Sequence, residues 1–191
     1  DNNIDLYTIN AHKIGAVKGC GGLIKKKNLQ IKPYLYGGGQ EQGFRSGTEN
    51  VFAVKCFEYA ALDRYSKLDE NFKKVSEFNK TMRKLLDSEL FTILSSENAS
   101  PYILSIAAKG VRGETILHEA DDNGLIIGTG SACSSNQKKR YSRVILSCGV
   151  DEVTADGVLR LSFSPENTLE EIKPAADILN RVVANRKRIM A

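Results

Sequence analysis

The chain has 191 residues, of which 41% are hydrophobic and 26% are charged, and its formal net charge is +4 at pH 7. These values are typical of a globular protein that can bury a real core in one or two domains. No apolar run approaches the length of a membrane span and no signal peptide opens the chain, so we predict a cytoplasmic protein without a membrane partner.

Basic residues gather at residues 25–27, at residues 138–140 and near the C-terminus between Arg181 and Arg188. Aromatic residues do not interleave with these clusters, as stacking on nucleic-acid bases would require. We therefore predict a solvated basic face and no nucleic-acid partner. The same clusters would also suit an acidic protein partner through charge complementarity.

The four cysteines stand at positions 20, 56, 133 and 148, too far apart for a C-x-x-C metal site. The sequence therefore predicts no metal. Cys148 shares helical spacing with apolar neighbours and Cys56 falls in a helical stretch, so we expect both to be buried. Only Cys133 lies in a segment that argues for exposure.

The first fifty residues alternate between strand patterns and glycine-rich turns. Residues 4–9 are aliphatic and predict a strand. Residues 17–31 predict a hairpin that turns near 25–28. Residues 37–49 contain five glycines and predict a loop.

Two helical patterns follow the loop. The first begins after Thr48 or Asn50, either of which can cap a helix, and runs to about Tyr65. The second shows apolar residues at core-facing intervals. They are Phe72, Val75, Phe78, Met82, Leu85 and Leu86. The two patterns could also form one long bent helix.

The rest of the chain mixes short strands with helices. The expected strands are 103–107, 125–128 and 158–163, and the expected helices are 114–122, 141–148 and a last helix opened by the capping box Thr168–Glu171. The inner face of the last helix is expected to hold Ile172, Ala176, Leu179 and Val183. In the last strand, Leu159, Leu161 and Phe163 share one face.

This mixture, without a regular strand–helix–strand repeat, predicts the α/β class with an α+β small domain. The domain boundary is expected between residues 63 and 72, where the chain is charged and locally poor in apolar residues.

The segment Thr129–Ser135 places one thiol, Cys133, in a run of small residues after an apolar lead-in. Glycine and serine favour a loop, which would present the sulfur and let it move. The alternative is a buried structural cysteine, the usual state of a free thiol.

A second segment, Asn10–Gly15, holds Lys13 between the aliphatic run and a set of glycines. A lysine whose amine is held neutral forms Schiff bases, and pyridoxal phosphate enzymes depend on one such residue. Taken alone, this lysine could equally be solvated. The loop from Gly37 to Asn50 adds glycine amides and polar donors that suit a phosphate.

Together, four ordered segments resemble the NifS-like cysteine desulfurases of the class V aminotransferase group, which are pyridoxal phosphate enzymes of fold type I. The segments are His12–Lys13, Gly37–Thr48, Gly130–Ser135 and Arg160–Ser162. The resemblance covers essentially the whole chain, although members of the group are about twice as long.

Because the chain begins with Asp1 shortly before Lys13, the resemblance implies the C-terminal half of such an enzyme. Residues 1–66 would be the end of the large cofactor-binding domain. Residues 67–191 would be the small domain that carries the cysteine loop. An isolated half that lacks the ring-stacking residues is expected to bind pyridoxal phosphate weakly.

The resemblance also implies a mechanism. Lys13 would hold pyridoxal phosphate as an imine and then move the substrate proton. Cys133, as a thiolate, would take sulfur from L-cysteine as a persulfide and release L-alanine. The sulfur would pass to an acceptor or iron–sulfur scaffold protein for cluster or thiolated RNA synthesis.

The remaining site residues also follow from the resemblance. Arg160 would bind the substrate carboxylate, for which its planar two-pronged donor is suited; otherwise it is a strand arginine that faces solvent. His12 and Asn10 would lie near the cofactor, although Asn10 stands where the family usually has a hydroxyl residue. Thr48 would reach the cofactor phosphate of a neighbouring subunit, which implies a homodimer.

Three functions therefore compete. The first is a cysteine desulfurase. The second is another class V enzyme with the same cofactor, such as a selenocysteine lyase or an aminotransferase, although a cysteine-bearing loop counts against an aminotransferase. The third is a non-catalytic sulfur-relay or partner-binding domain in which only Cys133 and the surface matter.

Overall fold

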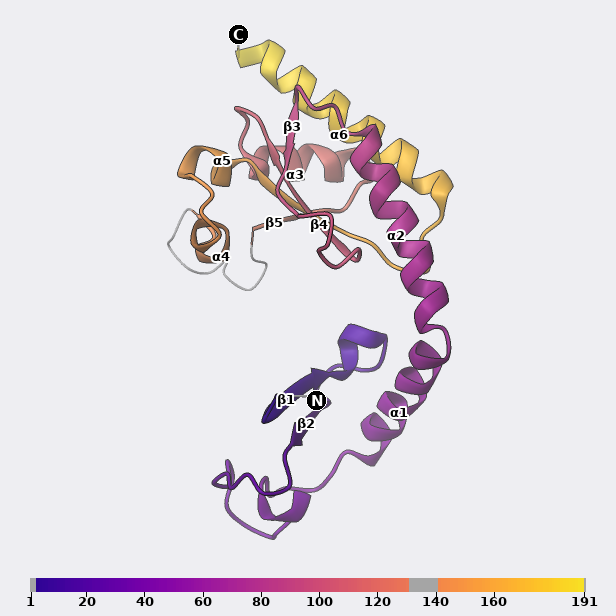
Figure 1. The fold of residues 1–191 in the computed structure, drawn as a ribbon, viewed down its shortest axis with the longest axis vertical. Coiled ribbons are helices and arrows are strands. Elements are labelled where there is room, and N and C mark those ends of the chain that lie inside the picture. Colours follow the sequence, from indigo (N-terminus) through magenta and orange to yellow (C-terminus); the bar gives the residue numbers. More distant parts are fainter. Residues whose placement is uncertain (1–2, 131–140, 191) are drawn as a thin grey trace. The chain divides into compact units, whose positions relative to one another are not determined.

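The structure is a computed structural model, and it describes residues 3–130 and 141–190. The cysteine loop predicted around Cys133 lies outside these residues. The chain divides into two compact units, Asp1–Leu68 (unit 1) and Asp69–Ala191 (unit 2) (Figure 1).

Unit 1 is built on an antiparallel strand pair, β1 (Leu6–Asn10) and β2 (Gly21–Lys25), joined by the 3-10 helix η1 (Ala11–Ile14). The expected strand at 4–9 is thus confirmed with a small shift. The hairpin predicted at 17–31 is wrong, because β2 pairs with β1. Beyond Lys25 the chain turns away, and the Leu29 amide donates to the Lys26 carbonyl at 3.0 Å.

The glycine-rich segment of unit 1 is a loop, as predicted, with one short 3-10 helix, η2 (Glu41–Gly43). It leads into α1 (Val51–Ser66). The Asn50 side chain accepts a hydrogen bond from the Ala53 amide at 3.1 Å, which makes Asn50 the N-cap and excludes Thr48 from that role. α1 ends at Ser66 and a separate helix starts at Leu68, so the two patterns form two helices and not the one long bent helix of the alternative.

Unit 2 contains a four-stranded antiparallel sheet in the order β3-β4-β6-β5. The strands are β3 (Phe91–Ile93), β4 (Ile103–Ala108), β6 (Val158–Ser162) and β5 (Gly128–Thr129). The strands expected at 103–107 and 158–163 are confirmed. The strand expected at 125–128 is mostly wrong, because only Gly128 and Thr129 pair with β6.

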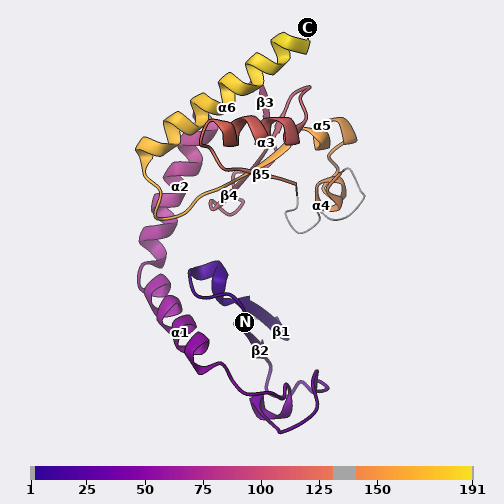
Figure 2. The same cartoon turned by 180° about the vertical axis from the view of Figure 1, so that it is seen from behind.

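Three long helices cover one face of this sheet (Figures 1 and 2). They are α2 (Leu68–Leu85), α3 (Gly113–Asp122) and α6 (Leu169–Met190). Two five-residue helices, α4 (Arg143–Ser147) and α5 (Glu152–Asp156), lie between β5 and β6 in the chain. In α6 the predicted capping box is formed in part, since Glu171 accepts the Thr168 amide at 3.1 Å.

The core of unit 2 lies between the sheet and these helices. Its buried members come from α2, α3, α6 and the strands. They are Val75, Phe78, Met82, Leu86, Phe91, Leu104, Ile106, Ala108, Val111, Ile116, Leu159, Leu161, Phe163, Ile172, Ala176, Leu179, Val182 and Val183. The inner faces predicted for α6 and β6 are therefore confirmed. Phe72 was also expected in the core, but it is 53% exposed because the first turns of α2 extend past the cluster, which begins at Val75.

The expectation for Cys148 is wrong, because this residue is exposed. The helix that should have buried it is only Arg143–Ser147, and Cys148 follows as its C-cap. One and a half turns do not make a continuous buried face. Cys20 and Cys56 are half-buried, which is also less than we expected for Cys56.

Residues 3–130 and 141–190 contain neither a candidate membrane span nor a candidate metal cluster. None of the helices there is both long and apolar enough to cross a membrane. Those residues also form no cluster of histidine, cysteine, aspartate or glutamate that could hold a metal ion.

Candidate functional site

Lys13 lies on a tight turn whose shape is set by a backbone hydrogen bond before the lysine and by a glycine after it. The Ala11 amide donates to the Cys20 carbonyl at 3.1 Å, and Ala11 is completely buried. Gly15 ends the turn in the left-handed region, at φ 94°, which a residue with a Cβ adopts only with strain. The side chains of His12 and Lys13 are exposed on this turn.

Arg64 of α1 provides a second anchor for the same turn. Its Nε donates to the Ile14 carbonyl at 3.2 Å. A Cβ on Gly15 would come to 3.4 Å from Nη2 of Arg64, so the guanidinium covers this part of the turn. Sequence analysis missed Arg64, because a single arginine in the last turn of a helix carries no indication of a partner fifty residues earlier.

The three residues predicted around the cofactor, Asn10, His12 and Lys13, are brought together here. Asn10 is the residue before η1, and its side chain makes no capping hydrogen bond. The side chains of Lys13 and His12 make no hydrogen bond or ion pair with any residue that the structure describes. The turn thus presents an amine and an imidazole that are free to bind a ligand.

The glycine-rich loop is ordered by its own contacts. Oε1 of Gln40 accepts a hydrogen bond from the Gly47 amide at 3.2 Å, which links the two ends of the segment 40–47. Gly47 has φ 120°, and a Cβ there would lie 2.6 Å from Nη1 of Arg45. The positive φ therefore favours glycine here, whereas the flexible end of Arg45 could move aside for a Cβ. Arg45 folds back over Gly47, and Thr48 is exposed in the same unit as Lys13.

In unit 2, Arg160 occupies the middle of β6. It pairs with Ser105 of β4 on one side and with Gly128 of β5 on the other. A Cβ on Gly128 would lie 3.1 Å from Nη2 and 3.5 Å from Nε of Arg160. The missing Cβ of Gly128 thus leaves room for the guanidinium to lie across β5.

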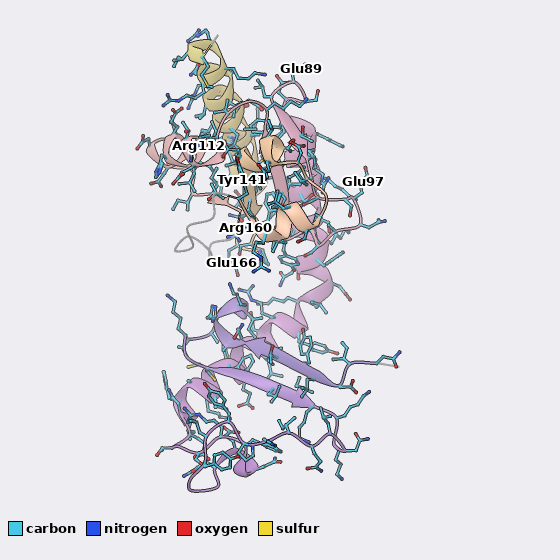
Figure 3. The ribbon with its side chains drawn as sticks, turned by 90° about the vertical axis from the view of Figure 1, so that its left-hand side faces the viewer. Glu89, Glu97, Arg112, Tyr141, Arg160 and Glu166 are labelled. Atoms are coloured by element: carbon cyan, nitrogen blue, oxygen red, sulfur yellow. The ribbon has the colours of Figure 1, made fainter. Side chains whose placement is uncertain are left out.

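Arg160 is half-buried as a residue, and its guanidinium has no hydrogen-bond or ion-pair partner within the described part of the chain. A cation taken partly out of water without a partner is suited to an anionic ligand. Figure 3 shows Arg160 with Tyr141 and Glu166 toward one end of unit 2, away from Glu89.

Cys133, the predicted nucleophile, belongs to the segment outside the described residues. The strand that precedes it is described as far as Gly130. Two residues of that strand pair with β6, Gly128 with Arg160 and Thr129 with Leu159.

A separate cavity of about 460 Å³ lies in unit 2 between residues 124–127, the end of β6 and the first turns of α6. Its lining is mostly apolar, as at Leu125, Ile127 and Ile178, and Arg160 does not line it. Its polar lining residues are Ser162, Asn167, Glu170 and Glu171, and none of the predicted site residues lies among them.

Comparison with known proteins identifies the family to which the chain belongs. The model of the class-V aminotransferases matches residues 1–174. A NifS/IcsS protein homolog of Lactobacillus delbrueckii is 34% identical over 174 residues, which cover 89% of this chain and 45% of the relative. A cysteine desulfurase IscS of Clostridium botulinum is 31% identical over 194 residues, which cover 99% of this chain and 49% of the relative.

Solved structures agree with this result. A NifS-like protein matches with a TM-score of 0.86 at 27% identity, over 96% of this chain and 47% of that one. A NifS-like protein of Rickettsia africae matches with a TM-score of 0.84 at 30% identity, over 95% of this chain and 48% of that one. The predicted fold class is thereby confirmed, and the chain spans about half the length of the relatives it matches. The chain belongs to the class-V aminotransferase family, in which its homologues are the NifS-like cysteine desulfurases.

Proposed function

We propose that this chain is part of a pyridoxal phosphate-dependent cysteine desulfurase that converts L-cysteine into L-alanine and an enzyme-bound persulfide. The observation that carries the proposal is the turn Ala11–Gly15, which presents the unpartnered amine of Lys13 on a fixed backbone. The homology to cysteine desulfurases supports the substrate.

The residues present fit pyridoxal phosphate. An aldehyde needs a free amine, and Lys13 supplies one. A phosphate needs hydrogen-bond donors. His12 lies next to Lys13 on the same turn, and Thr48 with the amides of the glycine-rich loop would, by resemblance, serve the phosphate of a neighbouring subunit. When bound, the cofactor would supply an electron sink for the substrate carbon atoms.

The chain's own residues would then divide the work. Arg160 would bind the substrate carboxylate with two parallel N–H donors. Nζ of Lys13 would accept the Cα proton of the substrate. Sγ of Cys133, as a thiolate, would attack the substrate sulfur; an S–S bond forms while the substrate C–S bond breaks. The carbon fragment keeps that electron pair and leaves, once protonated, as alanine.

We further propose that the enzyme is a cytoplasmic homodimer that passes its sulfur to an acceptor or iron–sulfur scaffold protein. Thr48, by resemblance, would contact the phosphate bound in the partner subunit. The large exposed apolar side chains of α1 support the idea that unit 1 is covered in the assembled enzyme. They include Phe52, Tyr59, Leu62 and Tyr65.

The test is to add pyridoxal phosphate, reduce with borohydride and map the modified lysine by mass spectrometry. We expect the label on Lys13, with its loss in Lys13→Ala and its retention in the matched variant Lys18→Ala, which removes another exposed lysine of unit 1. In the Cys133→Ser variant the label should persist while alanine is no longer formed from cysteine.

A label spread evenly over the surface lysines would contradict the proposal. A protein that is not labelled at Lys13 but accepts sulfur on Cys133 would instead be a sulfur-relay domain. A preference for selenocysteine over cysteine would indicate a selenocysteine lyase.

A further inference from the structure

Lys25, the last residue of β2, does not belong to a solvated basic face as its sequence neighbours suggest. Its Nζ lies 2.9 Å from the Leu29 carbonyl oxygen, 3.2 Å from that of Lys26 and 3.5 Å from that of Lys27. The same Nζ lies 5.4 Å from the centroid of the Phe44 ring. An ammonium has three N–H donors, and here carbonyl oxygens and an aromatic face surround it.

The two lysines that follow differ from Lys25. Lys26 reaches out to Asp5, with Nζ and Oδ1 2.7 Å apart, in an ion pair that is largely exposed. The side chain of Lys27 is exposed, whereas that of Lys25 is half-buried. Three identical residues in a row therefore have three different environments, and only Lys25 touches the glycine-rich segment.

Phe44 is the point through which this contact reaches the loop. Its carbonyl accepts the Tyr34 amide at 2.9 Å, and its own amide donates to the Glu41 carbonyl at 3.0 Å. Two residues further on, the Ser46 amide donates to the Leu35 carbonyl at 3.2 Å. Phe44 thus joins both sides of the segment 34–46, and Lys25 ties it to β2.

β2 in turn pairs with β1, the strand that leads directly into the turn of Lys13. We propose that Lys25 is a positioning residue, which holds the glycine-rich loop, through Phe44, against the strand pair that carries Lys13. This inference rests on the proposed function, because it assigns the loop and Thr48 to the phosphate of the cofactor.

The first experiment needs no cofactor. The native chain is acylated for increasing times with an amine-reactive reagent, and each lysine is followed by mass spectrometry. We expect Lys25 to react roughly tenfold more slowly than Lys27, because its ammonium must leave the three carbonyls and the ring before it can react. Equal rates at the two lysines would overturn the proposal.

The second experiment compares Lys25→Met with its matched control Lys27→Met, which removes the same charge two residues away. In Lys25→Met, amide hydrogen exchange at Tyr34 and Ser46 should rise by about fivefold or more, and pyridoxal phosphate should dissociate faster by a similar factor. Lys27→Met should change neither.

Faster exchange in Lys25→Met with unchanged cofactor dissociation would reduce Lys25 to a structural residue and overturn its positioning role. Equal behaviour of the two variants would do the same. A complete enzyme containing this chain that binds no pyridoxal phosphate would defeat the proposed function and, with it, the assignment of the loop to a phosphate. The acylation and exchange results would still show whether Lys25 holds the loop.

Discussion

Units 1 and 2 each combine helices with an antiparallel sheet but are stabilised in different ways. Unit 2 has a continuous core, in which Leu104, Ile106, Leu159 and Leu179 are completely buried. In the described part of unit 1, Ala11 and Ala53 are the only buried apolar residues. Burial of large side chains contributes most of the stability of a fold, so unit 2 has the elements of an independent domain and unit 1 does not.

Unit 1 is held instead by single polar contacts. Arg64 donates to Ile14, Gln40 accepts from Gly47, Asn50 caps α1, and Lys25 binds the turn at residues 26–29. Each such contact contributes about 0.5–1.5 kcal/mol, or somewhat more when charged. The shape of the turn that presents Lys13 therefore depends on a few individual side chains.

α1 shows the consequence most clearly. It has apolar side chains on all its sides, and Tyr59 is 78% exposed. A helix that is apolar all round is normally buried in the complete protein. Unit 1, which carries the proposed cofactor lysine, thus has an exposed apolar surface of the kind that another part of a protein normally buries.

The largest expected effect is a difference in stability between two leucine-to-alanine variants, one in a strand of each unit. Leu104 in β4 is 0% exposed and Leu23 in β2 is 52% exposed. We expect Leu104→Ala to lower the free energy of unfolding by about 2–5 kcal/mol, since it leaves a cavity. Leu23→Ala should change it by only about 0.5 kcal/mol.

Urea denaturation followed by circular dichroism measures both variants. The midpoint of the major transition should fall for Leu104→Ala and stay close to the wild-type value for Leu23→Ala. Comparable falls in the urea midpoint of the two variants would show that unit 1 also has a buried core, and the contrast between the units would then be wrong.

Much of unit 2 could be predicted from the sequence. In β6 and α6 the spacing of the apolar residues correctly predicted which side chains lie in the core, and in α6 the capping box also predicted where the helix starts. β3 was missed because three residues are too few to show a period. In unit 1 the wrong hairpin arose because strand patterns do not reveal which strands pair.

The candidate site was predictable only as residue types. Lys13, His12 and Arg160 stood out because of their motifs. Lys25 and Gly128 did not, because their roles depend on contacts across a turn or a strand pair. A lysine within a basic run looks solvated, and a glycine before a loop looks like part of the loop.

The next prediction concerns the space above Gly128 in unit 2. Gly128→Ala would put a Cβ 3.1 Å from Nη2 of Arg160, so the guanidinium must shift while the strand remains intact. In an active enzyme we expect the KM for cysteine to rise about tenfold with little change in kcat, because a carboxylate contact worth about 1.4 kcal/mol would be misaligned.

A second readout for Gly128→Ala is the NMR shift of the Arg160 Nε–Hε group, which should change without any loss of stability in urea. An unchanged shift would mean that the guanidinium does not lie across Gly128. An unchanged KM with a changed shift would mean that Arg160 does not bind the substrate.

A smaller difference is expected between the cysteines of the two units. Cys148 in unit 2 is exposed, whereas Cys56 in α1 of unit 1 is half-buried. Under native conditions a thiol reagent should therefore label Cys148 several-fold faster than Cys56. We expect Cys133 to react first of all, because it lies among small residues. Rapid labelling of Cys56 would indicate that α1 opens freely, and protection of Cys133 would argue against a delivery loop.

The smallest effect should arise at the helix starts. α1 of unit 1 is capped by the amide of Asn50, which does not titrate, whereas α5 and α6 of unit 2 begin at carboxylates. The side-chain amide of Asn167 and the backbone amide of Thr168 donate to Glu171 and hold the pKa of its carboxyl below the usual value of 4.5. Two hydrogen bonds from Thr154 likewise lower the pKa of Asp151.

A carboxyl whose pKa is lower in the folded state stabilises the fold above its unfolded pKa, and this stabilisation is lost as the pH falls through the folded value. We therefore expect the urea midpoint of wild type to lie slightly above that of Glu171→Gln at about pH 7, and the difference to shrink as the pH falls below 4.5. Glu170→Gln removes an equal charge from the same turn without breaking the Thr168 contact and corrects for net charge. Hydrogen exchange at the first turn of α6 should increase with acid, while that of α1 stays constant. If both helix starts loosen together below pH 4.5, the acid response belongs to the whole chain and not to the carboxylate caps of unit 2.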